Sequence, residues 1–362
     1  MKVLFLTPWY PSDRDKMEGL FVLKHVEAVQ AQGVDVRVIY SQGWRDMWQQ
    51  WRELKRSWGL PDVVQLNVIQ KQGLLALWLK RRYHIPYVII EHWTGYLPEN
   101  RQVRSGGWHT RLMKRICRKA EQVMPVSEHL IRAMQALGFV AKRWEKINNV
   151  VDDFFFDEPA DKQLKESTES QPNQPTRQPS DGKRAIQLLH ISCVDEAHKN
   201  IKGILRAVKA LSRERDVRLS IVGVSVDHAE VQAYARELGL EQIVRFTGEL
   251  TPRQVAEEFD RADIFVLNSN YENLPVVIAE SVAKGVPVVS TNVGGIPEMI
   301  DSQSGILINP QNDTELTEAL STMCAHHGDY DREAIRRNGR QYSYAEVGKQ
   351  LKTVYERAIK RL

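Results

Sequence analysis

The stretch Ser-Asn-Tyr-Glu-Asn-Leu-Pro-Val-Val-Ile-Ala-Glu at residues 269–280 decides the fold of this chain. Residues 262–267 before it have the apolar character of a buried strand, and residues 286–290 after it have the same character. A strand, a loop, a helix and a second strand make one unit of a parallel sheet. Ligands bind such sheets at the carboxyl ends of the strands, which is where Glu272 falls. Pro275 suits the first turn of the predicted helix, whose free amides can hold a phosphate.

The same alternation of strands and helices continues on both sides of this segment. It predicts strands at residues 2–7, 34–40, 62–68, 87–91, 122–126, 185–191, 217–223, 243–247, 263–267, 286–290 and 305–308. It predicts helices at residues 19–32, 72–84, 108–119, 127–136, 200–212, 228–238, 252–260, 275–284 and 312–324. We therefore expect an α/β protein with two Rossmann-like, doubly wound domains that face each other across a cleft. The predicted domains are residues 1–157 and 185–342, and an amphipathic helix at 343–362 is expected to pack back on the first of them.

Residues 158–184 interrupt this pattern. The run at 171–180 contains no apolar residue other than its three prolines. Such a segment cannot bury enough surface to offset the entropy of ordering it. We predict a disordered polar linker between the two domains.

Composition excludes several classes of protein. No apolar run in the 362 residues approaches the ~20 residues of a membrane-spanning helix. The N-terminus also lacks the pattern of a secretory signal. The three cysteines, Cys117, Cys193 and Cys324, form neither a metal-binding nor a disulfide spacing. A cytoplasmic protein is therefore expected.

The charge is unevenly distributed along the chain. Residues 1–158 hold 24 Lys and Arg against 17 Asp and Glu, whereas the remainder holds 26 against 29. In the first half, lysines and arginines interleave with Trp44, Trp48, Trp51 and Trp58, and again with Trp108. Such mixtures fit a lipid interface, so we expect peripheral contact with an anionic membrane surface at the inner membrane face. The alternative is an ordinary solvated surface with several tryptophans packed inside. A pI near 8.8 and the lack of a binding motif argue against nucleic acid as a partner.

Three further segments carry candidate site residues. Lys199 follows the predicted strand at 185–191, in a loop where a lysine can neutralise a diphosphate. Gly19, in the loop after the first strand, lets the backbone approach a ligand closely. His92 follows the strand at 87–91 and is placed to hydrogen-bond a substrate hydroxyl. The alternatives are an exposed lysine, a turn glycine and a structural histidine.

Several kinds of chemistry find no support. No Gly-x-Gly-x-x-Gly follows the first strand, and no Walker loop or zinc spacing occurs. The Asp-x-Asp pairs at 13–15 and 329–331 do not directly end a buried strand. We therefore expect neither a cofactor nor a metal.

Taken together, the sequence resembles the family-4 retaining glycosyltransferases, which have the GT-B fold. The resemblance covers nearly the whole chain outside 158–184. It rests on the segment from Glu272 to Glu280 with Gly-Val-Pro at 285–287, on Val-Gly-Gly-Ile-Pro-Glu at 293–298 and on Asn-Val-Val-Asp at 149–152. It implies transfer of a sugar from a UDP- or GDP-sugar to a saccharide or lipid-linked acceptor, with retained anomeric configuration. Bacterial polysaccharide or glycolipid assembly is the implied pathway.

The resemblance also implies roles for single residues. Glu280 would bind the ribose of the nucleotide, Glu272 the donor sugar and His92 the hydroxyls of the transferred sugar. Lys199 would neutralise the leaving phosphate, and Gly19 would approach that phosphate from the other domain. The backbone amides of Leu274, Val276 and Val277 would bind the diphosphate, and Asn273 and Pro275 belong to the same donor-binding segment. The base would lie beside Thr247, Gly248 and Leu250.

One position departs from the family pattern. Family members usually carry an arginine a few residues before the lysine, and this chain has Ser-Cys-Val at 192–194 instead. One positive charge on the diphosphate is therefore missing or comes from elsewhere. Two other functions stay open on the sequence alone. One is a GT-B nucleotide-sugar epimerase, which needs no acceptor, and the other is a non-catalytic protein that binds polyanions through its basic half.

Overall fold

The computed structural model describes residues 1–13, 15–100, 102–103, 107–157 and 184–360. The chain divides into two compact units, which are treated separately below. The N-terminal unit comprises Met1–Asp152 and Gln341–Leu362, and the C-terminal unit comprises Asp153–Arg340. Except for Arg184, the predicted linker lies outside the described residues.

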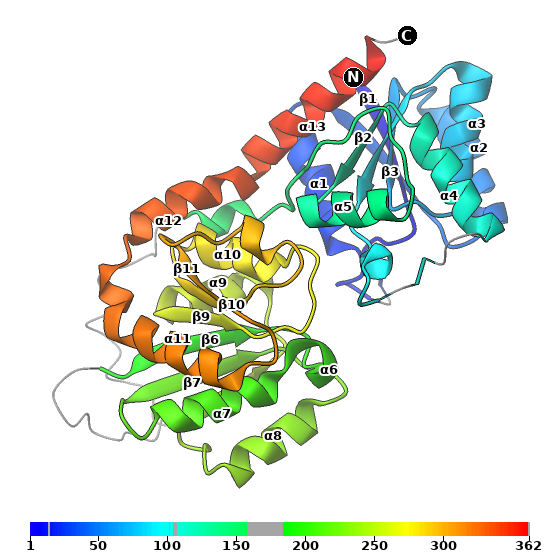
Figure 1. The fold of residues 1–362 in the computed structure, drawn as a ribbon. Coiled ribbons are helices and arrows are strands. Elements are labelled where there is room, and N and C mark those ends of the chain that lie inside the picture. The colour runs from blue at the N-terminus through cyan, green and yellow to red at the C-terminus, as the bar shows by residue number, and fades with distance from the viewer. Residues whose placement is uncertain (14, 101, 104–106, 158–183, 361–362) are drawn as a thin grey trace. The chain divides into compact units, whose positions relative to one another are not determined.

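The N-terminal unit is a parallel sheet with helices on both faces, and its strand order is β2-β1-β3-β4-β5 (Figure 1). This is one of the two common doubly wound orders. The strands are β1 (Lys2–Thr7), β2 (Asp35–Tyr40), β3 (Val63–Asn67), β4 (Tyr87–Glu91) and β5 (Gln122–Pro125). The helices are α1 (Leu20–Gln30), α2 (Trp44–Ser57), α3 (Gly73–Tyr83), α4 (Trp108–Lys119), α5 (Glu128–Ala136) and α13 (Tyr344–Ile359), with a short 3-10 turn, η1 (Thr94–Tyr96).

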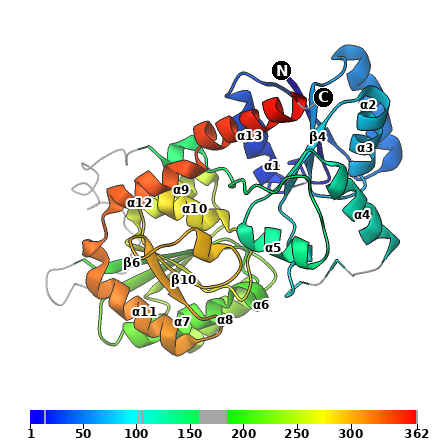
Figure 2. The same cartoon turned by 45° about the horizontal axis from the view of Figure 1, so that its top comes forward.

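The helices of this unit form two layers. On one face of the sheet, α1 and α13 pack together, while α2, α3 and α4 lie on the other (Figures 1 and 2). The central strands β3 and β4 are buried along their whole length. Strands that are covered on both faces read as continuous apolar runs, which is why they were recognisable in the sequence.

The C-terminal unit is a second parallel sheet, with the strand order β11-β10-β9-β6-β7-β8. Its strands are β6 (Ile186–Ile191), β7 (Val217–Val222), β8 (Val244–Gly248), β9 (Ile264–Leu267), β10 (Val288–Thr291) and β11 (Gly305–Ile308). Its helices are α6 (Glu196–Lys199), α7 (Ile201–Leu211), α8 (His228–Glu237), α9 (Pro252–Arg261), α10 (Val276–Ala283), α11 (Asp313–His326) and α12 (Arg332–Gly339). One face of the sheet is covered by α7, α8 and α11, and the other by α9, α10 and α12 (Figure 2). The core on the first face is built from apolar side chains of α7, α11 and the strands, such as Ile204, Leu320 and Val266.

The α/β prediction is confirmed, and each of the predicted strands forms within two residues of its expected bounds. Three helices, α2, α6 and α12, were not predicted. Helices α2 and α12 each bury only two residues, Met47 and Trp51 in α2, and Ile335 and Gly339 in α12. The sequence nevertheless contains a signal for α2, because Trp44, Met47, Trp48 and Trp51 recur at the helical spacing i, i+3, i+4 and i+7.

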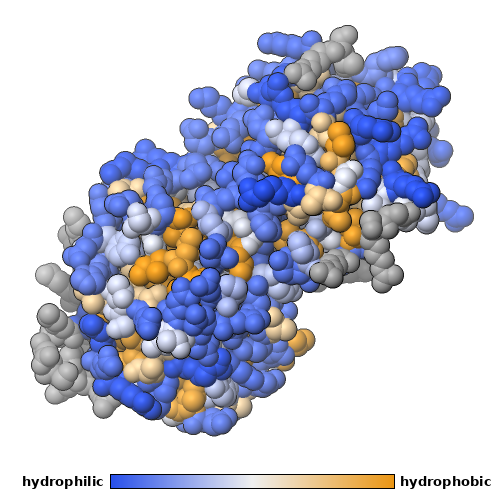
Figure 3. Space-filling view, in the orientation of Figure 1, coloured by the Kyte–Doolittle hydropathy of each residue, from blue (hydrophilic) through white to orange (hydrophobic). Residues whose placement is uncertain are grey.

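The surface is mostly polar. On the face drawn in Figure 3, hydrophobic side chains form separate patches within a largely hydrophilic surface. Among the described residues, none of the helices is long and apolar enough to cross a membrane.

Candidate active site

The strand order of the C-terminal unit creates a switch point between β6 and β9. The chain leaves β6 toward β7 on one side and returns through β9 on the other side. Connections that diverge in this way leave a crevice at the carboxyl ends of the two strands, where open α/β sheets bind their ligands. Lys199 follows β6 and Glu272 follows β9. The strand order therefore brings both residues to this edge.

Lys199 and Glu272 form a buried ion pair here. Nζ of Lys199 lies 2.5 Å from Oε1 of Glu272, and the two residues are 8% and 7% exposed. The hydroxyl of Ser269 donates to the same oxygen at 2.7 Å. None of the described residues donates to Oε2 of Glu272, so this oxygen stays available as an acceptor. Each charge is held in position by the other and by burial.

A second set of bonds ties the loops after β6 and β9 together. Nε2 of His198 donates to the carbonyl of Tyr271 at 2.7 Å, and the two rings stack with centroids 4.1 Å apart. The backbone amide of Asn270 donates to the carbonyl of His198 at 2.8 Å, and its side-chain amide donates to the carbonyl of Ala197 at 2.8 Å. Burial, reinforced by the charge of Lys199, lowers the pKa of His198. The neutral ring, with its proton on Nε2, is therefore the form that makes this bond.

Helix α10 begins at this edge without a capping side chain. Its N-cap residue is Pro275, and no side chain hydrogen-bonds there as a cap. First-turn amides have no acceptor within their own helix and attract an anion. The neighbouring helix α7 differs, because the carboxylate of Glu196 accepts from the amides of Ile201 and Lys202 at 2.8 and 3.1 Å. The protein thus supplies an anion to the start of α7 and no such cap to the start of α10.

The turn after β10 supports the loop that carries Glu272. The amide of Gly295 donates to the carbonyl of Asn273 at 2.7 Å. Gly294 has a φ of +58°, and a Cβ at this position would lie 1.9 Å from the carbonyl oxygen of Glu272. Only glycine fits such a contact. The Gly-Gly turn in the 293–298 segment therefore packs directly against the backbone of the Glu272 loop and holds it in place.

Glu280 lies on α10 and is 9% exposed. Side chains of a helix lean toward its N-terminus. We therefore expect the side chain of Glu280 to lean toward the first turn, which contains Val276 and Val277. This arrangement suits a ligand that places phosphates on the first turn and neighbouring hydroxyls beside Glu280.

The residues expected to line the base lie farther along the same sheet edge. Thr247 and Gly248 end β8, with Leu250 just beyond, and β7 separates β8 from β6. Gly248 has a φ of +76°, and nothing lies within 4 Å of the position that a Cβ would take. Glycine is therefore favoured at position 248 because of the positive φ, and not because a side chain would clash with a neighbour.

The two candidates in the N-terminal unit follow β1 and β4. Gly19 has a φ of +67°, and a Cβ there would lie 2.4 Å from the carbonyl carbon of Trp9. In this structure Gly19 therefore lies against the backbone of Trp9, and its contact with a phosphate stays a prediction. The ring of His92 packs against that of Phe21 with centroids 4.2 Å apart and a tilt of 40°. Burial lowers the pKa of His92 well below the ordinary value. Its imidazole is therefore neutral.

Sequence reasoning missed the supporting residues of the site. It assigned no role to Ser269, which donates to Glu272, or to His198, which ties the two loops. It also missed Glu196, whose spacing of five residues before Ile201 is no standard capping signal. These contacts join segments that are far apart in the sequence or use unusual local geometry.

Two family models match the chain. Glycosyltransferase Family 4 matches residues 1–153, and Glycosyl transferases group 1 matches residues 182–342. This chain belongs to the family-4 glycosyltransferases. The group 1 match contains the Lys199–Glu272 pair and α10 of this glycosyltransferase.

Curated relatives of the glycosyltransferase include two actinobacterial enzymes. An MMP alpha-(1->4)-mannosyltransferase of Mycolicibacterium hassiacum is 30% identical over 194 residues, which are 51% of this chain and 46% of that protein. A D-inositol 3-phosphate glycosyltransferase of Corynebacterium kroppenstedtii is 33% identical over 138 residues, which are 36% of this chain and 30% of that protein. The chain therefore spans less than half the length of each of these relatives.

Solved structures extend the likeness over the whole chain. A sucrose-phosphate synthase of Thermosynechococcus elongatus has a TM-score of 0.75 at 18% identity and covers 100% of both chains. Anabaena HepE, in complex with UDP, also has a TM-score of 0.75 at 18% identity and covers 99% of this chain and 100% of its own. Identities this low establish the fold alone, and they confirm the predicted GT-B fold.

We expect Gly294→Ala to destabilise the C-terminal unit by forcing the backbone of Glu272 to move. Overpacking of this kind costs about 1–3 kcal/mol, in addition to the cost of a positive φ. The control is Gly239→Ala, which has a φ of +66° but only the flexible end of Lys209 nearby, at 3.7 Å. Free energies of unfolding from urea titration measure both. Equal losses in the two variants would show that the contact with Glu272 carries no cost.

Proposed function

We propose that this glycosyltransferase moves a sugar from a nucleoside-diphosphate sugar to an acceptor hydroxyl, with retention of the anomeric configuration. The observation that carries the proposal is the buried Lys199–Glu272 pair beside the uncapped start of α10. This arrangement supplies a fixed cation and helix amides for a diphosphate, and a free carboxylate oxygen for a sugar hydroxyl. Nucleotide-sugar donors are in keeping with HepE, a structural neighbour solved with UDP and with UDP and glucose.

The costly step is cleavage of the bond between the anomeric carbon and the phosphate oxygen. Negative charge then grows on the diphosphate while positive charge grows on the sugar. Lys199 and the first-turn amides of α10 would stabilise the former, and the carboxylate of Glu272 would face the latter. Because Glu272 already holds Lys199 in place, the cation needs little reorganisation during the step. The family resemblance implies a front-face route, in which the departing phosphate takes the proton of the acceptor.

We also propose that the reaction needs neither a metal ion nor a cofactor. The positive charge on the diphosphate would come from Lys199 and the start of α10. In the 192–194 turn, where family members usually carry an arginine, the chain has an exposed Cys193 and a buried Val194. Lys199 is therefore our candidate for the cation of this loop. Transfer that persists in excess EDTA would support the metal-free reaction.

The donor is proposed to be a UDP- or GDP-sugar carrying a hexose or related sugar. The acceptor is proposed to be a saccharide or lipid-linked saccharide in bacterial polysaccharide or glycolipid assembly. A thermal-shift screen with UDP-, GDP- and other activated sugars identifies the base and the sugar. Incubation with the donor alone then separates transfer from epimerisation, because an epimerase converts the sugar without an acceptor.

We expect Glu280→Ala to weaken binding of the nucleotide-sugar by about 10- to 100-fold, because hydrogen bonds to a charged group contribute about 1.5–3 kcal/mol. Isothermal calorimetry measures the affinity. The matched control is Glu241→Ala, which removes an exposed carboxylate from the same unit. Wild-type affinity in Glu280→Ala would show that the ribose lies elsewhere.

We expect Lys199→Met to lower turnover about 100- to 1,000-fold, as does the loss of one preorganised donor in other enzymes. This variant leaves Glu272 buried without its partner, which by itself destabilises the fold. The double variant Lys199→Met/Glu272→Gln removes both charges and is expected to restore stability without restoring turnover. Turnover equal to wild type in the folded double variant would exclude the pair from the reaction.

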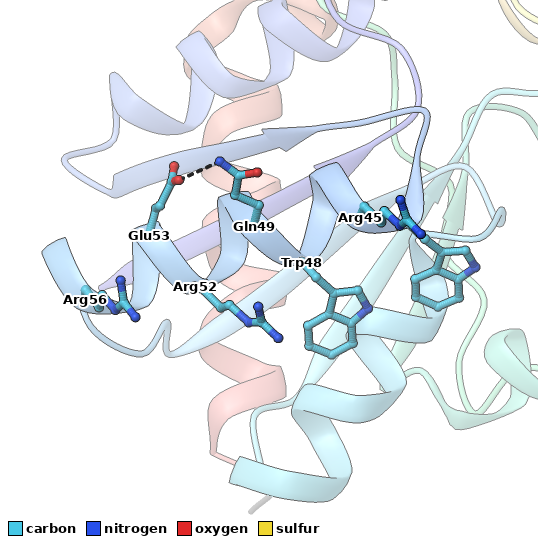
Figure 4. A pocket seen from close by; sticks show the side chains of 7 residues that line it. Arg45, Trp48, Gln49, Arg52, Glu53 and Arg56 are labelled. Atoms are coloured by element: carbon cyan, nitrogen blue, oxygen red, sulfur yellow. Dashed lines mark hydrogen bonds between the residues drawn. The ribbon is translucent and has the colours of Figure 1, made fainter.

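A basic surface of the N-terminal unit is formed by helices α2, α3 and α4, which pack side by side. The rings of Trp48 in α2 and Trp78 in α3 have centroids 4.9 Å apart. Nζ of Lys80 in α3 donates to the carbonyl of Lys119 in α4 at 2.7 Å. Together these helices carry twelve Lys and Arg against two Asp and Glu. Figure 4 shows side chains of α2, including Trp48, Arg52 and Arg56, lining a groove along the helix. We name this surface the basic helix face.

Two tryptophans of the basic helix face are exposed at the starts of their helices. Trp44 is 46% exposed and Trp108 is 76% exposed. By contrast, Trp51 is 2% exposed, and Nε1 of Trp58 donates to Asp35 at 2.6 Å, so these two are structural. Exposed tryptophans among lysines and arginines fit a lipid interface. We propose a cytoplasmic enzyme that associates peripherally with the anionic inner membrane face through the basic helix face.

We expect the protein to sediment with vesicles that contain anionic lipid at low salt, and to be released at high salt, because surface cations contribute about 1 kcal/mol each and are screened. Replacing Trp108, Arg111 and Arg115 together by Ser should weaken sedimentation at least tenfold. The control replaces the exposed Arg213 and Arg236 of the C-terminal unit by Ser. Equal binding to neutral phosphatidylcholine vesicles would refute this partner.

A further inference from the structure

Glu91 is a buried carboxylate surrounded by hydrogen-bond donors. It ends β4 and is fully buried. Its Oε1 accepts from the amides of His92 and Trp93, each at 3.0 Å. Its Oε2 accepts from the amide of Ile69 at 3.0 Å and from the hydroxyl of Tyr96 at 2.9 Å. Three of the four partners are backbone amides, which can only donate, and the hydroxyl of Tyr96 donates as well in this arrangement. An ionised carboxylate accepts from all four.

The four bonds join two loops at the carboxyl edge of the sheet. Ile69 belongs to the loop after β3, and the other three donors belong to the loop after β4. The residue before Ile69 is Val68, which has a φ of +65°. A β-branched residue in this region is strained, and it persists only when its surroundings hold it there. The bond from Ile69 to Glu91 is one of the contacts that hold it.

No cation balances this charge among the described residues: Glu91 forms no ion pair there. The ionisable groups that face it are neutral. They are Tyr96 and, from α4, Cys117, and burial raises the pKa of both. Beside them, the imidazole of His92 is also neutral. Burial raises the pKa of Glu91 to about 7, although its four hydrogen bonds oppose the change.

We propose that Glu91 is a positioning residue for sugar transfer, whose ionised carboxylate holds the loop of His92 and the strained loop after β3 in the geometry that the reaction needs. Protonation makes one carboxyl oxygen a donor, which only the hydroxyl of Tyr96 can accept, and it leaves both oxygens poorer acceptors for the three amides. The bonds that hold the loop of His92 are then weaker. This inference rests on the proposed function, because sugar transfer is the activity that the loop serves.

The pH dependence of stability and the pH dependence of turnover should run in opposite directions, and this separates a positioning role from a purely structural one. The pKa of Glu91 lies above its ordinary value of 4.5, so the folded protein binds the proton more tightly than the unfolded chain does. The contribution of Glu91 to stability is therefore present below pH 4.5 and is lost as the pH rises to about 7. Turnover should change in the opposite direction and rise over the same range, because the ionised form positions the loop.

The experiment measures kcat, KM and thermal unfolding between pH 5.5 and 8.5 for wild type, Glu91→Gln and Glu91→Asp. In wild type we expect kcat to fall about tenfold per pH unit below pH 7 while thermal stability does not fall with it. Glu91→Gln should lower kcat about 10- to 100-fold, as a small misplacement does, and should lose this limb of the profile. Glu91→Asp should recover part of kcat and keep the limb. The control is Glu99→Gln, an exposed residue of the same loop region.

A second readout does not depend on activity. The amide NMR signals of Ile69, His92 and Trp93 should titrate together near pH 7 in wild type and should not titrate in Glu91→Gln. Nucleotide affinity, which belongs to the C-terminal unit, should be unchanged in every variant. The inference is overturned if the three amides do not titrate together, or if folded Glu91→Gln keeps the wild-type kcat and pH profile. Titrating amides in a protein that transfers no sugar would overturn the proposed function and leave the loop linkage standing.

Discussion

The parallel pairing of β6 with β9 is the constraint on which the candidate site depends. Leu188 and Leu189 pair with Ile264 and Phe265, although 76 residues separate them in the chain. This pairing places the ends of two strands side by side, and with them the loops that carry Lys199 and Glu272. The remaining contacts of the site, from His198, Ser269 and Gly294, hold the two loops in place once the strands have paired. Loss of the β6–β9 pairing would separate the cation from its carboxylate.

Two carboxylates prepare the site for an anion in different ways. Glu272 holds Lys199, and Glu196 caps α7, while α10 has no side-chain cap. A buried ion pair is weak evidence for stability, because desolvation offsets the attraction. Its value here is positional, because the bond to Glu272 holds the amino group of Lys199 in place where it is largely shielded from water. Glu196 occupies the start of α7, whereas the start of α10 has no side-chain cap. An incoming diphosphate would thus meet one oriented cation and one set of oriented amides.

The N-terminal unit uses the same edge of its own sheet in a different way. Its buried carboxylate at Glu91 has amide donors for partners where Glu272 has a lysine. A carboxylate balanced only by dipoles is more easily protonated than one balanced by a cation, because the low dielectric penalises its charge. The two units therefore hold their loops by carboxylates of contrasting chemistry. The same unit gathers its excess positive charge on the basic helix face, away from its layer of α1 and α13.

The sequence alone determined the succession of elements, because strands buried on both faces and helices with broad apolar stripes impose their periods on the local pattern. It also located Lys199 and Glu272 after recognisable strands, and Glu280 on the helix that follows Glu272. Helices α2 and α12 bury only two residues each and were not predicted, although the apolar residues of α2 recur at helical spacing. The tertiary structure decided which residues meet: that Lys199 pairs with Glu272, that Gly19 accommodates the backbone of Trp9, and that Trp51 and Trp58 pack while Trp44 and Trp108 are exposed. Such contacts depend on strand order and loop path, which are properties of the whole chain and leave no trace in the spacing of neighbouring residues.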